Sequence, residues 1–297
     1  MDGERHRSGS GGERARSGRP GRVGVCLTSG FFGFFAHTGF VLALERLGIR
    51  PVAATGSSAG AIVAALWASG RDGPEIRDRL LPLRRAEFWD LASPLDWLRG
   101  PPGLLRGDAM QRLLEKHLAC RTFEECRFPV AVNAFNVGAR RATYFRSGPL
   151  APAVRASASL PGLFQPARIA GGWYLDGGFV EKTPLAPLLE RGDVDVVLVH
   201  HLRSTSAPAL AGRPGVLDVL RSALETLRGR LDETLLAAAE RSGKRLVVVE
   251  PDPPRVDPFH LERGAAALEA AREHALRALG AGATATAAPA DAAGRSA

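Results

Sequence analysis

The sequence predicts an α/β fold in which a mainly parallel sheet is flanked by helices on both faces. Short β-branched runs bounded by glycine or proline indicate buried strands, and longer runs with apolar residues at helical spacing indicate helices. Over the first 70 residues these two patterns alternate, which is typical of a parallel sheet with helices packed against it. No Pro/Ser linker separates regular blocks, so we expect one domain over residues 22–280.

Each expected strand and helix follows from a pattern in its own stretch of sequence. The strands are apolar or β-branched runs that enter or leave glycine turns, and we expect them at 22–28, 51–55, 128–137, 141–148, 171–178, 194–202 and 244–252. The helices have apolar residues at helical spacing, and we expect them at 36–49, 59–70, 73–85, 107–119, 149–164, 214–243 and 260–280. Gly48 and Gly70 end the first two helices, Pro161 ends the fifth, and Gly138 lies in a predicted hairpin. Residues 86–106 are irregular, aromatic and broken by prolines.

Composition narrows the class of protein. A 45% apolar and 24% charged composition is that of a globular protein, and the net charge of +8 is compatible with weak attraction to anionic lipid. No zinc-finger spacing or RNA-binding motif is present, so nucleic acid is not an expected partner. Cys26, Cys120 and Cys126 are an odd number without metal-ligand spacing, which predicts reduced thiols and no metal.

The two ends of the chain lack the patterns of folded elements. Residues 1–21 are rich in Arg, Gly and Ser, and residues 281–297 are small-residue low complexity, so we expect both to be disordered tails. The opening has no apolar centre typical of a signal peptide, and no apolar run approaches the roughly 20 residues of a membrane span. We therefore expect a cytoplasmic protein, at most peripheral to a membrane.

The stretch Gly56-Ser57-Ser58-Ala59-Gly60 joins a predicted strand to a predicted helix. A serine at such a turn is held in a strained backbone conformation, and small neighbours let other elements approach it. The helix that follows directs its N-terminal N–H groups toward an anion formed at the turn. Ser58 is therefore a candidate nucleophile, and Gly56 and Gly60 are motif glycines.

A serine needs a base, and the residues leave two arrangements open. One is a Ser-Asp-His triad that uses His200, His201, His260 or His274. The other is a single carboxylate that accepts the proton directly.

Three stretches together resemble the patatin-like phospholipases: "TGSSAGAIVAALWASG", "TFEECRFPVAVNAFNVGARRATYFRSG" and "ASASLPGLFQPARIAGGWYLDGGFVEKTPL". The resemblance covers about residues 22–187 and implies a three-layer α/β architecture with a serine–aspartate dyad. By this resemblance Ser58 is the nucleophile and Asp176 is the base, so no histidine needs a catalytic role and no cofactor is implied. The residue chemistry agrees, because Asp176 ends the apolar run "WYL" and precedes Gly177 and Gly178, where a partly desolvated carboxylate could act as a base. The resemblance also implies a phospholipid or acylglycerol ester as substrate.

The segment expected to form the oxyanion hole departs from the family pattern. The family has a glycine triplet, a small residue, a basic residue and a glycine, whereas this chain has Ser29-Gly30-Phe31-Phe32-Gly33-Phe34. Oxyanion stabilisation uses backbone N–H groups, so Gly30, Phe31 and Phe32 remain candidate donors, with Gly33 as a further motif glycine. The phenylalanines could also line an acyl-chain pocket.

Two further hypotheses concern lipid. The irregular segment around Phe88, Trp89, Leu91, Leu95, Trp97 and Leu98 has the composition of a lipid-facing lid. The altered oxyanion segment also leaves open a catalytically inactive homologue that binds lipid or a partner protein. A lipid acyl hydrolase, with peripheral contact to an anionic membrane, is the function that the sequence favours.

Overall fold

The structure, a computed structural model, describes residues 21–99, 103–203, 237 and 242–284. Within them an eight-stranded sheet has the order β5-β6-β3-β2-β1-β7-β8, and β4 pairs with β3. The strands are β1 Val23–Leu27, β2 Pro51–Ser57, β3 Val130–Asn136, β4 Arg141–Phe145, β5 Ala167–Ile169, β6 Gly172–Asp176, β7 Val196–His200 and β8 Arg245–Val249. The α-helices are α1 Phe34–Arg46, α2 Ala59–Ser69, α3 Gly73–Leu80, α4 Pro94–Arg99, α5 Asp108–His117, α6 Leu150–Ser157, α7 Ala186–Leu189 and α9 Gly264–Thr284.

The sheet is mainly parallel, as the sequence predicts. Strands β3, β2, β1, β7 and β8 run parallel to one another, whereas β4 and β6 pair antiparallel with β3, and β5 pairs antiparallel with β6. The parallel strands are short β-branched runs, and nearly every residue of β1 is buried. Such two-sided burial is typical of strands that have helices on both faces.

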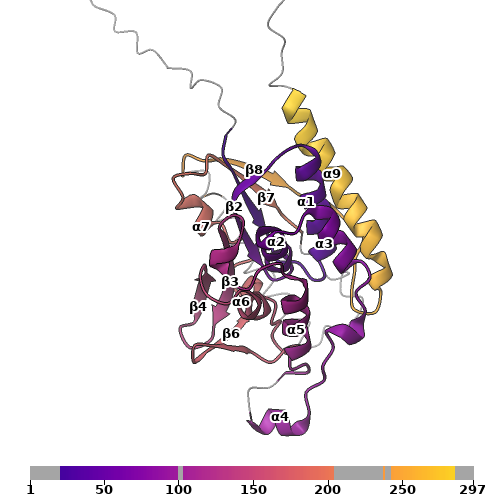
Figure 1. Cartoon of the computed structure of the whole chain (residues 1–297), viewed down its shortest axis with the longest axis vertical. Helices are drawn as coiled ribbons and strands as arrows, with labels where there is room; N and C mark the ends of the chain where they lie inside the picture. Colours follow the sequence, from indigo (N-terminus) through magenta and orange to yellow (C-terminus); the bar gives the residue numbers. More distant parts are fainter. Residues whose placement is uncertain (1–20, 100–102, 204–236, 238–241, 285–297) are drawn as a thin grey trace, which may run out of the picture.

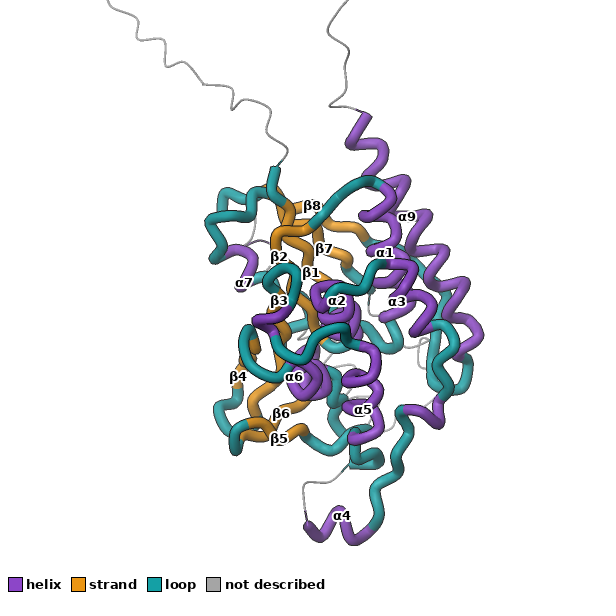
Figure 2. The backbone as a smooth tube through the Cα atoms, in the orientation of Figure 1, coloured by secondary structure: helices purple, strands orange, loops and turns teal. Residues whose placement is uncertain are grey.

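Successive residues of β1 show the two covered faces. Val25 and Leu27 belong to the large core cluster formed with α1 and α2, whereas Cys26 packs with Leu185 and Leu188 at α7. Figures 1 and 2 show α1, α3 and α9 on one side of the sheet and α7 on the other. The helix-sheet-helix arrangement expected for an α/β fold is therefore confirmed.

The long helix α9 packs closely against α1. A Cβ added at Gly39 would lie 2.0 Å from the Leu268 carbonyl oxygen, so only glycine permits this helix–helix approach. α9 covers the side of α1 that faces away from the sheet (Figure 1). It thereby completes the layer that supports the segment between β1 and α1.

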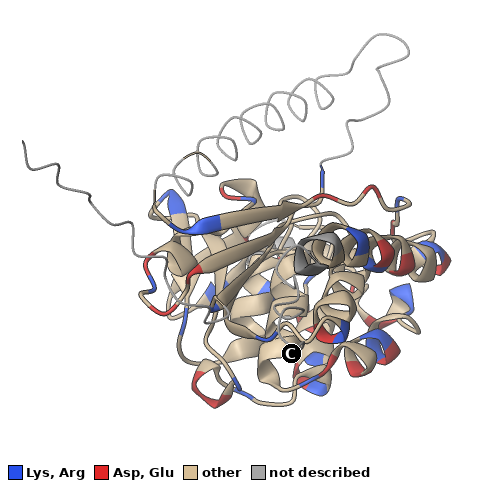
Figure 3. Cartoon of the chain, turned by 90° about the horizontal axis from the view of Figure 1, so that it is seen from above, with Lys and Arg blue, Asp and Glu red and all other residues tan. Residues whose placement is uncertain are grey.

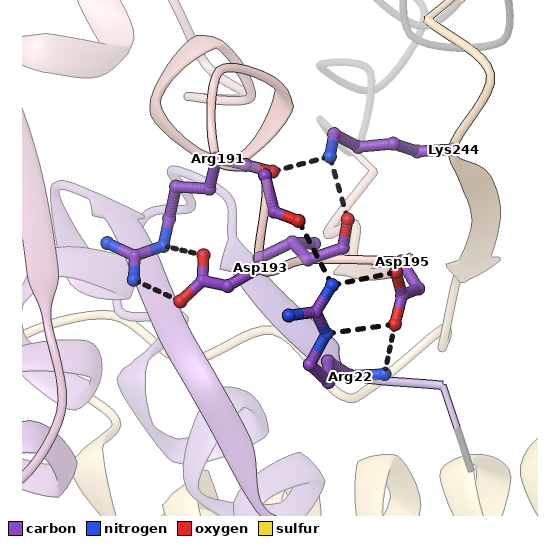
Figure 4. Close-up of polar contacts among 7 residues, drawn as sticks. Arg22, Arg191, Asp193, Asp195 and Lys244 are labelled. Atoms are coloured by element: carbon purple, nitrogen blue, oxygen red, sulfur yellow. Dashed lines mark hydrogen bonds and ion pairs between the residues drawn. The ribbon is translucent and has the colours of Figure 1, made fainter. Parts of the chain in front are cut away.

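A polar network ties together the amino ends of β1, β7 and β8 (Figure 4). The Arg22 guanidinium and N–H group bind the Asp195 carboxylate, with the N–H donating over 2.9 Å. These bonds hold the pKa of Asp195 at about 2, below its ordinary value. Lys244 Nζ donates to the carbonyl oxygens of Arg191 and Val194 at 2.6 and 2.7 Å. The opposite, carboxyl ends of the strands are left for the functional groups.

Residues 88–99 and 103–106 form an arm that carries α4 away from the body of the molecule (Figure 1). Its two sides pair through Ala92 N–H and the Leu104 carbonyl oxygen, 2.8 Å apart. Leu91, Leu95 and Leu104 are exposed on it. The lid predicted from the sequence falls on this arm and stays a prediction.

The ribbon in Figure 3 shows Lys and Arg interspersed with Asp and Glu along the described elements. Within the described residues, no helix combines the length and apolarity that crossing a bilayer would require. The thiol sulfurs of Cys120 and Cys126 lie 3.6 Å apart without a disulfide bond. Burial raises the pKa of the Cys126 thiol to about 12.

Several elements differ in extent from the sequence expectation. α6 ends at Ser157, four residues before Pro161, because Ala158 and Ser159 close a tight turn on Val154, Arg155 and Ala156. β5 and α7 are only three and four residues long and carry no periodic signal. α9 continues to Thr284, past the expected limit at 280. Most of the helix expected at 214–243 lies outside the described residues, as do 1–20 and 285–297 of the two expected tails.

Candidate active site

The carboxyl ends of β2 and β6 meet along one edge of β3. The parallel strand β2 ends with Ser57 opposite Asn133, and the antiparallel strand β6 ends with Asp176 opposite Ala134. Because Asn133 and Ala134 are consecutive, the two strand ends lie one residue spacing apart, about 3.3 Å. The change from parallel to antiparallel pairing therefore brings residue 58 next to residue 176.

Ser58 lies at the turn between β2 and α2 and is partly exposed. Its φ of 52° and ψ of −118° are strained for a residue with a side chain, as the strand-to-helix motif predicts. Its N–H donates to Ser157 Oγ over 2.9 Å, which fixes the backbone of the turn. Its Oγ lies 2.6 Å from Asp176 Oδ2 and donates a hydrogen bond to it. The structure thus brings the two residues predicted from sequence into direct contact.

Asp176 is only 3% exposed, and its carboxylate is held on both sides. One oxygen accepts from Ser58, and the other accepts the Gly178 N–H at 2.8 Å. The Asp176 N–H donates to the Ser159 carbonyl oxygen at 2.8 Å. The side chain therefore presents a fixed oxygen to the serine, which is the geometry that a general base requires.

The motif glycines allow the elements of the site to approach one another. A Cβ at Gly178 would lie 2.1 Å from Ser29 Oγ, and one at Gly60 would lie 2.2 Å from the Leu27 carbonyl oxygen. Added Cβ atoms at the other motif glycines would meet neighbours at 2.3–2.5 Å, namely at Gly33, Gly56 and Gly177. The turn after β1 is consequently pressed against both the Asp176 turn and the first turn of α2.

The turn Thr28–Gly33, which follows β1, holds the candidate oxyanion donors. The Gly33 N–H donates to the Gly30 carbonyl oxygen at 2.9 Å and closes the turn. In the part of the chain that the structure describes, no hydrogen bond uses the N–H groups of Gly30, Phe31 or Phe32. The N–H of Ala59, the first residue of α2, is likewise unbonded among these residues. Donors without partners beside a nucleophile are what an oxyanion hole requires.

The aromatic residues of this turn extend away from it as a band. Phe31 is 59% exposed and makes an edge contact with Phe32, whose ring centroid lies 6.1 Å from that of Phe88. Phe32 has a φ of 52°, a conformation that glycine would adopt without strain. The band lies at the base of the arm, as an apolar surface adjoining the turn.

The histidines considered for a triad lie in other interactions. His200 is buried against His37, His201 Nδ1 lies 2.8 Å from Glu250 Oε1, and His260 pairs with Asp257. His274 lies on α9. Among the described residues, no histidine makes a hydrogen bond to Ser58.

Other features contribute nothing to this site. A cavity of about 660 Å³ opens beside residues 53–55 in the middle of β2, and it is lined mainly by residues 123–131 and 187–191. Neither Ser58 nor Asp176 lines it. Over the described ranges, no three His, Cys, Asp or Glu side chains are placed to hold a metal ion.

Sequence reasoning did not identify Ser157 or Ser159, whose hydroxyl and carbonyl oxygens hold the backbones of the two central residues. The stretch "ASASLPGLF" could have indicated them, because it has two closely spaced serines just before the proline at the end of a predicted helix. Ala59 was indicated only through the helix N-terminus to which it belongs. These are backbone and supporting contacts, which a side-chain motif does not specify.

Curated proteins of bacteria and fungi are similar in sequence to more than half of this chain. An "Uncharacterized NTE family protein" of Mycobacterium tuberculosis is 29% identical over 203 residues, which is 68% of this chain and 55% of that protein. "Lysophospholipase NTE1" of Cryptococcus neoformans is 30% identical over 182 residues, 60% of this chain but 11% of that protein. The chain thus spans only part of the curated relatives that it matches. VipD from Legionella pneumophila aligns at 17% identity with a TM-score of 0.49, over 88% of this chain and 67% of VipD.

The family comparison covers the site itself. The sequence model of the patatin-like phospholipases matches residues 25–189 of the 297. The matched region includes the turn after β1, Ser58 and Asp176. Because it exceeds half of the chain, the protein belongs to the patatin-like phospholipase family.

Proposed function

We propose that this protein is a serine hydrolase of lipid carboxylic esters, in which Ser58 is the nucleophile and Asp176 is the general base. The observation that carries the proposal is the 2.6 Å hydrogen bond from Ser58 Oγ to Asp176 Oδ2. Membership of a phospholipase family and the lysophospholipase name of the fungal relative support a lipid ester as substrate. The exposed aromatic band beside the turn supports an acyl chain as the part of the substrate that binds there.

In the first half of the reaction, Ser58 Oγ attacks the ester carbonyl carbon. Its proton passes to Asp176 Oδ2, and the same proton then goes to the alcohol oxygen as the carbonyl carbon–oxygen bond to the alcohol breaks. An acyl-enzyme on Ser58 remains. In the second half, water gives a proton to Asp176 and attacks the acyl carbon, the fatty acid leaves, and Ser58 regains its hydrogen.

The charge that forms on the carbonyl oxygen needs donors fixed in advance. The N–H groups of Gly30 and Phe31, with those of Phe32 and Ala59 as additional donors, are the groups that we assign to it. Removing one such donor from an oxyanion hole typically costs about two to three orders of magnitude in kcat. The Ser58 N–H is excluded from this role because it is bonded to Ser157 Oγ.

Labelling with a fluorophosphonate probe tests the proposal, combined with hydrolysis of a short-chain nitrophenyl ester and of a lysophospholipid. Ser58→Ala should abolish labelling and turnover. Asp176→Asn should reduce both by at least about a thousandfold, because the base is lost while the side-chain shape is kept. Asp252→Asn is the matched control, since Asp252 is exposed and remote in sequence from the site.

The same set of variants separates the other functions. If His201→Ala removed turnover while Asp176→Asn retained it, a histidine triad would replace the dyad. A wild-type protein that binds lysophospholipid vesicles but is never labelled would be a binding protein and not a hydrolase.

A further inference from the structure

Two histidines that the proposed chemistry does not use lie buried beneath the turn Thr28–Gly33. His37 and His200 are both completely buried, and their Nδ1 atoms are 2.7 Å apart. His37 Nε2 lies 2.8 Å from the Thr28 carbonyl oxygen. Burial lowers the pKa of His37 to about 3 and holds that of His200 well below its ordinary value, so both rings are neutral near pH 7.

The hydrogen bonds fix which nitrogen carries each proton. A carbonyl oxygen only accepts, so His37 Nε2 carries hydrogen and donates to Thr28. A neutral ring has one N–H, and His37 Nδ1 therefore accepts. His200 Nδ1–H must be its donor, which leaves His200 Nε2 without hydrogen; this atom has no partner among the described residues. The Thr28 carbonyl thus sets the tautomer of His37, and His37 in turn sets that of His200.

His37 connects the two ends of the turn. Its side chain holds the Thr28 carbonyl oxygen, and its backbone N–H donates to the Gly33 carbonyl oxygen at 2.9 Å. The peptide group that contains the Thr28 carbonyl also contains the Ser29 N–H, which donates to the Lys182 carbonyl oxygen at 3.0 Å. Both ends of this peptide plane are therefore fixed. The next peptide along the chain carries the unbonded N–H of Gly30.

The end of β7 supports the same turn from below. The His200 carbonyl oxygen accepts from the Thr28 hydroxyl at 3.1 Å, and the Leu202 N–H donates to that hydroxyl at 3.0 Å. The Leu202 side chain fills the space beside Gly30 and Gly33, where an added Cβ would lie 2.8 and 2.3 Å from its Cδ1. The ring of Phe40 stacks on His200 at 4.3 Å and 7° between planes, which fixes the orientation of that ring.

We propose that His37 is a positioning residue for the oxyanion donors, oriented in turn by its hydrogen bond from His200. This inference rests on the proposed serine hydrolase function. His37 acts on Gly30 and Phe31 only through the Thr28–Ser29 peptide and makes no hydrogen bond to Ser58. Oxyanion donors contribute most when they are fixed before the reaction, so loosening this peptide should lower kcat and leave KM nearly unchanged.

A pair of amide substitutions tests the inference, because each amide reproduces one ring nitrogen. The amide of His37→Gln reaches the position of Nε2 and can still donate to the Thr28 carbonyl oxygen. The amide of His37→Asn reaches only the position of Nδ1, so it keeps the bond with His200 and loses the bond with Thr28. We expect His37→Gln to keep kcat within about threefold of wild type and His37→Asn to lose about 10- to 100-fold.

The assay is hydrolysis of a soluble short-chain nitrophenyl ester, with kcat expressed per active site titrated by fluorophosphonate and with the melting temperature of each variant measured. His117→Gln is the control, because His117 is partly exposed at the end of α5. Equal kcat in the two His37 variants, or a fall in kcat that follows the melting temperature alone, would overturn the positioning role. If the wild type were not labelled, or Ser58→Ala were still labelled, the serine hydrolase function itself would fail, and the two failures are therefore distinguishable.

Discussion

Acidification from pH 7 to pH 5.5 should destabilise the folded protein, because His37 and His200 are buried as neutral rings. The pKa of His37 falls to about 3 on folding and that of His200 falls well below its ordinary value, whereas in the unfolded chain both are near 6.5. Below pH 6.5 the unfolded state therefore binds more protons than the folded state. The stability that the two neutral rings contribute is fully present above pH 6.5, and it is lost as the pH falls toward their folded-state pKa values.

The size of the effect follows from proton linkage. Each group that takes up a proton only on unfolding changes the free energy of unfolding by about 1.4 kcal/mol per pH unit, once the pH is well below 6.5. Integrated from pH 7 to pH 5.5, this is about 1.3 kcal/mol for each ring and about 2.5 kcal/mol for the two. That is a large part of the 5–15 kcal/mol typical of a folded domain.

Carboxyl groups change the free energy of unfolding little between pH 7 and pH 5.5. The pKa of Asp195 is about 2 in the folded state, so its contribution is lost only below about pH 4. Burial raises the pKa of Glu45, which acts with the opposite sign at lower pH, and the series therefore stops at 5.5.

The measurement is urea unfolding at four pH values between 7 and 5.5. The wild type should lose about 2.5 kcal/mol from this pair, and His37→Gln should lose about half as much. His117→Gln should keep the contribution of the buried pair and lose only that of His117, whose pKa is lowered by partial burial. A free energy of unfolding that stays level over this range would refute the buried, neutral histidine pair.

Three other substitutions have expected outcomes that follow from local geometry. Ser58→Gly should raise the free energy of unfolding by about 1 kcal/mol while abolishing probe labelling, because glycine adopts the φ of 52° without strain; a destabilised variant in thermal melts would contradict this. Gly178→Ala places a methyl group 2.1 Å from Ser29 Oγ, so ester hydrolysis should fall at least about tenfold, and wild-type kinetics would show that the turn can move aside. Ala170→Asn should stabilise the β5–β6 turn by about 0.5 kcal/mol without changing turnover, since Ala170 has a φ of 47° next to Gly171 at 83°; an unchanged melting temperature would count against the strain.

The elements that the sequence predicted best are those with long, uninterrupted patterns. The strand at β1 and the helices α1 and α2 follow β-branched or helical spacing with glycine at their ends, so their positions could be derived locally. β5 and α7 are too short to carry a period, and their positions depend on what they pack against. Pro161 was expected to end α6, but the helix ends earlier, where the Ser157 hydroxyl accepts the Ser58 N–H and the Ser159 carbonyl oxygen accepts the Asp176 N–H.

The residues of the candidate site also differ in how far the sequence could predict them. Ser58 could be chosen from its turn, because glycines around a reactive side chain leave a mark in the sequence, and the resemblance to the patatin-like phospholipases selected Asp176 among the carboxylates. The unbonded N–H groups of Gly30 and Phe31 could be listed only as candidates, since backbone donors have no residue identity. The link between His37 and Thr28 could not be derived at all, because the His37 ring is oriented by a contact with His200, which is 163 residues away in the chain.

The meeting of β2 and β6 along β3 makes the alignment of nucleophile and base independent of the length of chain that joins them. The positions of Ser58 and Asp176 are set by backbone pairing to two consecutive residues, Asn133 and Ala134. The arm with α4 belongs to the part of the chain between Ser58 and Asp176, which are 118 positions apart in the sequence. Because the arm projects outward, insertions and deletions in it leave the pairing of β2 and β6 with β3 intact. Substrate preference could therefore diverge through the arm while the geometry of proton transfer stays the same.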